Sequence, residues 1–120
     1  MSTLNVANIT DGTTTVATGY VVNGSAKAWV SFTGTGTVTI QDSFEMSSIT
    51  DRGVGLYTVN FSSAFDNALY ACTAGSAAFT ADGMGSSRTT TSSYTENKDA
   101  RTYAAVDSPN YFFVAIGDLA

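Results

Sequence analysis

Short apolar stretches separated by glycine pairs fill residues 27–62, and this arrangement restricts the possible folds more than any other feature of the chain. In the first stretch Ala28, Val30 and Phe32 alternate with other residues, so they project to one face of an extended strand, while Trp29 projects to the other. Glycine at the junctions suits the positive backbone angles of tight turns. The repetition of this unit predicts a series of short strands joined by turns.

A change of phase in the second part of this stretch predicts a β-bulge. Phe44 and Met46 keep to one alternation, but Ile49 falls on the opposite parity. An extra residue near positions 47–48 would restore the phase and keep this large aliphatic side chain out of water.

Further strand candidates complete the predicted architecture. Residues 57–62 alternate strictly, and residues 69–73, 101–106 and 111–116 are also apolar enough to be strands. For residues 75–99 the pattern leaves strand and loop open, and no part of the chain indicates a helix. The spacing predicts an all-β fold, a small antiparallel β-sandwich that is jelly-roll-like or a related barrel.

The last strand candidate, residues 111–116, is apolar at nearly every position, which indicates burial on both faces. Since so small a domain has one core, we expect one of these faces to meet another subunit. Trp29, Phe112 and Phe113 are the predicted subunit-interface residues. Charged residues make up only 12% of the chain, which also favours an obligate oligomer with cyclic symmetry.

Residues 1–25 differ from the rest of the chain. Their few sizeable apolar side chains, such as Leu4, Val6 and Ile9, are too thinly spread for a separate core. The segment is therefore predicted to be an N-terminal arm that becomes ordered against a partner, with a strand on the edge of the domain as the alternative. The β-sandwich domain is expected to span residues 26–120.

Charge and hydropathy narrow the choice of partners. The formal net charge is −5, which argues against nucleic acid and against an anionic membrane surface. No apolar run approaches the ~18 residues of a membrane-spanning helix, and no secretory leader precedes the domain. We therefore expect a protein that is made in a cytosol and does not insert into a membrane.

The sequence offers little catalytic chemistry. It has no histidine and no glycine loop of the nucleotide-binding kind. The single cysteine, Cys72, lies in an apolar run and is predicted to be a buried hydrophobic residue. We predict no catalytic residue, no metal site and no cofactor. A polysaccharide-degrading enzyme that uses Asp42, Asp82 and Asp99 is the alternative from a different functional class.

A polar patch that includes an aromatic residue follows the hydroxyl-rich part of the chain. Tyr94, Asn97 and Asp99 combine a ring that can lie beneath a sugar with an amide and a carboxylate that can bond its hydroxyls. These are the predicted receptor-binding residues. An exposed loop with an ordinary tyrosine is the alternative.

Several short motifs follow one another in a fixed order: KAWV at 27–30, Phe32, GTGT at 34–37, SSITD at 47–51 and YTVNF at 57–61. Together they resemble a module of bacteriophage tail-fibre proteins, especially those of marine and cyanobacterial phages. The first four residues and residues 114–118 are also similar to the starts and ends of such fibres.

This resemblance implies a homotrimeric, β-rich virion protein that is made in the host cytoplasm. Its N-terminal arm would contact other virion proteins, and its β-domain would bind a polysaccharide or a protein on the host surface. No long shaft separates the arm from the domain, which departs from long fibres. A capsid decoration or head-fibre protein that braces or studs the shell is therefore the alternative.

Overall fold

The computed structural model describes residues 2–76, 87–99 and 101–120. All strand pairs in this part of the chain are antiparallel, so the predicted all-β, antiparallel class is confirmed. The prediction that the chain has no helix is wrong, because one short helix is present. The elements in chain order are β1 (Asn8–Thr10), β2 (Thr15–Ala17), α1 (Thr18–Gly24), β3 (Ala26–Thr33), β4 (Thr39–Phe44), β5 (Met46–Gly53), β6 (Leu56–Phe61), β7 (Ala71–Ser76), β8 (Ser92–Glu96) and β9 (Tyr111–Ile116).

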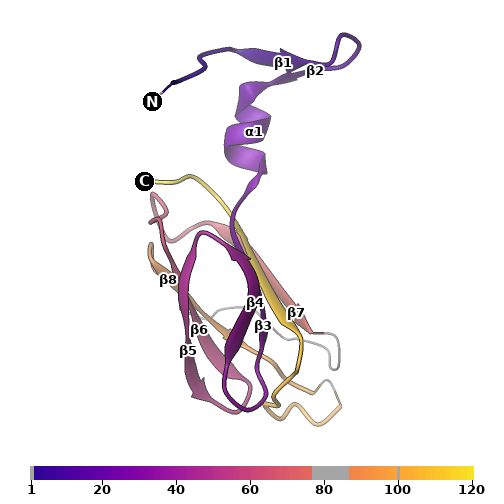
Figure 1. The fold of residues 1–120 in the computed structure, drawn as a ribbon, viewed down its shortest axis with the longest axis vertical. Coiled ribbons are helices and arrows are strands. Elements are labelled where there is room, and N and C mark those ends of the chain that lie inside the picture. Colours follow the sequence, from indigo (N-terminus) through magenta and orange to yellow (C-terminus); the bar gives the residue numbers. More distant parts are fainter. Residues whose placement is uncertain (1, 77–86, 100) are drawn as a thin grey trace.

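Two sheets form the β-domain (Figure 1). One has four strands in the order β4-β3-β9-β7, and the other has three in the order β5-β6-β8. The chain passes from the first sheet to the second at Glu45, which lies between β4 and β5 and has a φ of 57°. Since the left-handed region is unusual for a residue other than glycine, this residue marks a sharp change in chain direction.

The inward faces of both sheets meet in one hydrophobic core. Ala28, Val30 and Phe32 point into it from β3, as the alternation predicts, and each is at most 1% exposed. Phe32 packs edge to face on Tyr57 of the other sheet, with ring centroids 5.0 Å apart. Burying one large apolar side chain stabilises a fold by roughly 1.5–3 kcal/mol, so this cluster holds the two sheets together.

The predicted β-bulge is confirmed at the start of β5. The register steps by one residue between Met46 and Ser48, which pair with Phe61 and Asn60 on β6. Because of this step Ile49 packs against the core instead of facing water.

The strand predicted at residues 101–106 is wrong, because these residues form a loop. The amide of Tyr103 donates to Asp99 O and the amide of Asp99 donates to Ala104 O, at 2.7 and 2.9 Å. Tyr103 has a φ of 60°, which lies outside the extended region. These local bonds fold the segment back on itself and prevent an extended strand.

The other late strand candidates need smaller corrections. The strand predicted at residues 69–73 begins two residues later, at Ala71, and Leu69 is exposed. Cys72 on this strand is half-buried and packs against the core. The strand at residues 111–116 is present as β9, but the prediction that both of its faces are buried is wrong for the single chain, because Phe112 and Ile116 are exposed.

Residues 2–25 project from one end of the β-domain (Figure 1). β1 and β2 form a small hairpin, α1 follows, and the chain then enters β3. The projection gives the molecule a long axis of 50 Å against 29 and 24 Å for the other two. We call residues 2–25 the arm.

Candidate functional site

The arm leaves all of its larger apolar side chains exposed. None of its residues is buried, although the segment carries several aliphatic residues and a tyrosine. Asp11 is its only charged residue. The exposed apolar residues are Leu4, Val6, Ile9, Val16, Tyr20, Val21 and Val22.

The arm has too few interactions of its own to hold this shape alone. α1 is only seven residues long, its N-cap is Ala17 without a capping side chain, and none of its residues is buried. Isolated helices of this length are unstable in water, and Val21 and Val22 are poor helix formers. A lone hairpin of two three-residue strands is also marginal. The contacts within the chain therefore contribute little to stabilising the arm.

The turn of the hairpin between β1 and β2 is stabilised by hydrogen bonds to Asp11. Asp11 Oδ1 accepts the amides of Thr13 and Thr14 at 2.9 and 2.7 Å, which closes the turn. These backbone donors, Thr14 first, lower the pKa of the Asp11 carboxyl. The turn is therefore defined locally, while the apolar sides of the hairpin are not covered.

A shallow hollow of about 390 Å³ lies between residues 3–9 and α1. Its apolar lining comes from Leu4, Val6 and Ile9 on one side and from Val21 and Val22 on the other. An uncharged apolar hollow of this kind fits an apolar side chain of a partner better than a charged ligand.

Part of the outer face of the four-stranded sheet is also apolar, beside a polar part in which Gln41 bonds Ser31 and Thr33. Phe44, Trp29 and Val114 lie side by side on β4, β3 and β9, and Phe112 and Ile116 flank them on β9. Phe44 is 52% exposed and Phe112 is 45% exposed, while Trp29 and Val114 are partly buried. We call this surface the tryptophan face.

The structure places only two of the three predicted interface residues on the surface. Trp29 and Phe112 both lie on the tryptophan face, where a neighbouring copy has access to them. Phe113 is directed to the opposite side of β9 and is fully buried in the core of its own chain. It has no surface to offer a neighbour, so this residue has to be removed from the predicted interface. Phe44 and Val114 belong to the same face, and sequence reasoning missed them.

The outer face of the three-stranded sheet is polar. Asn60 Nδ2 donates to Ser48 Oγ and to Thr50 Oγ1, each at 3.0 Å. Arg52 Nε donates to Thr58 Oγ1 across the same pair of strands. These side chains bond one another on the outward side of the sheet, where Thr58 is covered by its neighbours, and we call this surface the hydroxyl face.

Tyr94 of β8 extends the hydroxyl face with a short chain of polar contacts. Its hydroxyl donates to Glu96 Oε1 at 3.0 Å, and Lys98 Nζ pairs with Glu96 Oε2 at 2.8 Å. Burial and then the bond to Glu96 raise the pKa of Tyr94. Lys98 Nζ also lies 4.6 Å from the ring centroid of Tyr103.

The predicted receptor-binding residues are only partly accessible. Asn97 is fully buried and its Nδ2 donates to Val106 O at 2.8 Å, so it is a structural residue and the prediction of a receptor contact is corrected. The side chain of Asp99 is only 16% exposed and accepts the amide of Arg101. The sequence analysis missed Tyr103, which is 65% exposed in the same loop. Because residues 101–106 were expected to form a strand, Tyr103 was not considered as an exposed loop residue.

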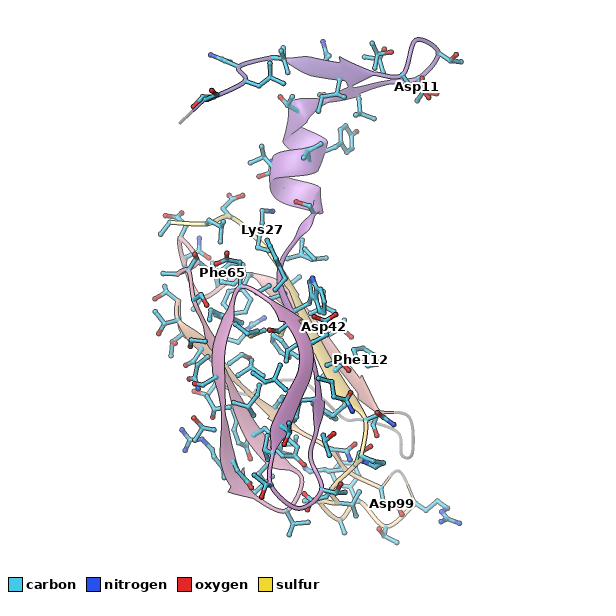
Figure 2. All side chains as sticks on the ribbon, in the orientation of Figure 1. Asp11, Lys27, Asp42, Phe65, Asp99 and Phe112 are labelled. Atoms are coloured by element: carbon cyan, nitrogen blue, oxygen red, sulfur yellow. The ribbon has the colours of Figure 1, made fainter. Side chains whose placement is uncertain are left out.

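Hydrogen bonds tie together the loops at the end of the domain that lies away from the arm. Asp107 Oδ1 accepts the amide of Gly55 at 2.8 Å and the hydroxyl of Tyr57 at 3.0 Å. The amide of Gly34 donates to Ser108 O at 2.8 Å. Burial, followed by the bond to Asp107, raises the pKa of Tyr57 well above its ordinary value. These bonds hold the loops of residues 34, 55 and 107–108 together, and we call this end of the domain the platform. Figure 2 shows Asp99 at this end, opposite to Asp11.

The carboxylates of the alternative enzymatic hypothesis do not form one site among the described residues. Asp42 lies on the outside of the four-stranded sheet and Asp99 lies in a loop at the far end of the domain (Figure 2). Asp82 lies outside the described residues. The described part of the chain contains no cluster of three acidic, cysteine or histidine residues suited to a metal ion. It also contains no helix with the length and hydropathy of a membrane-spanning segment.

Comparisons of the chain with protein-family models, with curated proteins and with solved structures found no match.

Proposed function

We propose that this chain is a structural protein of a bacteriophage particle. It is a short, tail-fibre-like homotrimer, attached to the virion by its arm, and it presents a β-sandwich domain to a polysaccharide or a protein of the host surface. The observation that carries the proposal is the arm, which exposes its apolar residues and lacks the interactions to stay folded without a partner.

Two further observations support the proposal. The motifs at residues 27–61 resemble the tail-fibre module, and they coincide with strands β3 to β6 and with the bulge of β5. The arm and the platform of bonded loops lie at opposite ends of the long axis (Figure 1). An elongated protein with an attachment segment at one end and hydrogen-bonded loops at the other suits the task of joining a particle to a cell.

We assign host contact to Tyr103 and the accessible part of Asp99 on the platform, and to the accessible part of Tyr94 on the adjoining hydroxyl face. Tyr103 supplies an exposed ring, and the ion pair of Lys98 with Glu96 lies next to it. Sugars bind proteins through this combination of an aromatic surface with charged and amide groups that bond hydroxyls.

Imaging of purified particles tests the proposal. Antibodies against the full chain, coupled to gold, should label particles purified by density gradient. Label at the tail would support the fibre assignment, and label over the head would favour the alternative, a capsid decoration or head-fibre protein. Particles without the chain, from cells that contain it in soluble form, would contradict both.

Attachment through the arm has its own test. The full-length variant Val21→Asp with Val22→Asp puts two charges on α1 and should lower incorporation into particles by at least about tenfold, since burying an unpaired charge is costly. The matched control, Thr35→Asp with Thr37→Asp, adds the same charge to an exposed loop of the β-domain. Equal incorporation of both variants would show that the arm is not the attachment segment.

A further inference from the structure

We infer that the tryptophan face is the surface through which copies of this chain assemble, with the four-stranded sheets turned toward a shared symmetry axis. This inference rests on the homotrimer of the proposed function and names its contact surface. The hydroxyl face then points outward in every copy.

The contrast between the two outer faces is the first argument. On the hydroxyl face, Asn60, Thr50 and Arg52 are in side-chain hydrogen bonds between neighbouring strands. On the tryptophan face, three adjacent strands present large apolar side chains at paired positions, with Phe44 beside Trp29. The polar side chains of this sheet, Ser31, Thr33 and Gln41, bond one another farther along β3 and β4. A contiguous exposed apolar patch of this kind marks an interaction surface.

Charge identifies a second copy as the occupant. The four strands of this sheet contain only two charged residues, Lys27 and Asp42, of opposite sign. The net charge of −5 therefore lies entirely on other parts of the chain. Contact through the tryptophan face avoids the repulsion between copies that other orientations produce, and it offers Lys27 of one copy to Asp42 of the next.

The dimensions of the sheet suit three copies. Four strands at about 4.8 Å spacing make a face about 19 Å wide. Three such faces arranged as a triangular prism would each lie roughly 5–6 Å from the axis, close to half of the ~10 Å between packed sheets. Closure would also bring the β4 edge of one copy beside the β7 edge of the next. Among the described residues each of these strands pairs on one side only, and a ring covers such edges.

The area of the face indicates that the arm takes part in the same assembly. β9 has six residues, so the face is about 20 Å long and covers about 400 Å². A stable interface buries roughly 800 Å² on each partner. Because the arm continues directly from β3, copies aligned by their sheets also bring their arms together, and the exposed apolar residues of the arm can supply the remaining area.

The test is the assembly state of the full chain in solution. The variant Phe44→Ser with Phe112→Ser removes two rings from the tryptophan face. The matched control, Val54→Ser with Leu56→Ser, removes two apolar side chains at the turn between β5 and β6, away from the tryptophan face. Sedimentation velocity and light scattering should show that the wild type and the control assemble, while the first variant needs at least roughly tenfold more protein to do so. If that variant does not fold by circular dichroism, Phe44→Ser alone on the edge strand replaces it.

A second readout reports on the face directly. Trp29 is the only tryptophan, so its fluorescence should shift to shorter wavelength as the wild type assembles, and this shift should be lost in the variant of the tryptophan face. A wild-type chain that stays monomeric at high concentration would overturn the inference. So would a trimer that persists unchanged in this variant, although it would leave the proposed function in place. Absence of the chain from particles would overturn the proposed function alone.

Discussion

The arm and the β-domain use the same kinds of residue in opposite ways. In the β-domain Val30, Phe32 and Phe113 are buried against the facing sheet. In the arm Val21 and Tyr20 are exposed, and no residue is buried. The difference shows that packing within the chain explains the apolar residues of the domain but not those of the arm, which the proposed function assigns to contact with a partner. Substitutions in the two regions should therefore affect different measurements.

The largest expected effect is on the core. Phe113→Ala should lower the free energy of unfolding by about 3–5 kcal/mol, because it leaves a cavity where a fully buried ring was. Urea unfolding at one fixed protein concentration measures this change. The control is Leu69→Ala, which truncates an 83% exposed side chain and should cost less than about 0.5 kcal/mol. Similar losses in both variants would mean that Phe113 is not the core residue described above.

The next largest loss of stability is expected from replacing Gly55, at the end of the domain away from the arm. Gly55 has a φ of +68°, and a Cβ there would lie 2.6 Å from Asn97 O and 2.7 Å from Val106 N, both backbone atoms. Gly55→Ala should therefore cost at least about 2 kcal/mol, the sum of left-handed strain and a contact that cannot relax. Gly36→Ala isolates the strain, since Gly36 has a φ of +64° with nothing within 4 Å. Gly12→Ala in the arm should leave unfolding of the domain unchanged.

Tyr57→Phe should have a smaller effect. It removes the bonds of the hydroxyl to Gly34 O and Asp107 Oδ1 but keeps the ring, so the expected loss is about 1–2 kcal/mol in urea unfolding. Asp107 keeps the amide of Gly55 as a donor. A loss under about 0.3 kcal/mol would mean that this hydroxyl does not help to hold the loops together.

The same hydroxyl predicts a dependence on alkaline pH. The pKa of Tyr57 is raised from its ordinary value of 10.0, because burial and Asp107 both disfavour the phenolate. Below about pH 10 its contribution to stability is complete, and above that pH the unfolded chain loses the proton first, so stability falls as pH rises. Urea unfolding between about pH 8 and pH 11 should show a shallower decline for Tyr57→Phe. Tyr70, whose pKa burial also raises, accounts for a remaining slope.

The smallest expected change in stability is in the arm. Tyr20→Ala truncates a side chain that is 75% exposed and should alter the unfolding of the domain by less than about 0.5 kcal/mol. If the arm is the attachment segment, the same variant should reduce incorporation into particles. A loss of domain stability above about 1 kcal/mol would mean that the two regions are not independent.

Sequence reasoning predicted best where one face is apolar and the other is not. β3 was assigned correctly, with Ala28, Val30 and Phe32 inward, and the phase of Ile49 identified the bulge of β5. In both places a period of two and a single core leave one arrangement that keeps large side chains out of water.

Sequence reasoning failed where the pattern of apolar residues fits more than one arrangement, and where backbone hydrogen bonds determine the structure. Tyr111 to Ile116 are all apolar, so parity alone could not show that Phe113 points inward and Phe112 outward. The loop that buries Asn97 and exposes Tyr103 depends on backbone hydrogen bonds and on a left-handed residue, which no local periodicity encodes. α1 was missed because glycine and β-branched valine are poor helix formers.

The entry of the arm into β3 has a mechanical consequence. β3 pairs with β9 from Ala26 to Phe32 and with β4 from Trp29 to Thr33, so it is anchored by two ladders. A pull transmitted through α1 would act along this strand and strain many of its hydrogen bonds in parallel, instead of opening them one after another. The arm is thus joined to the domain at a strand well placed to resist shear, which would benefit the proposed role of holding two large bodies together against flow.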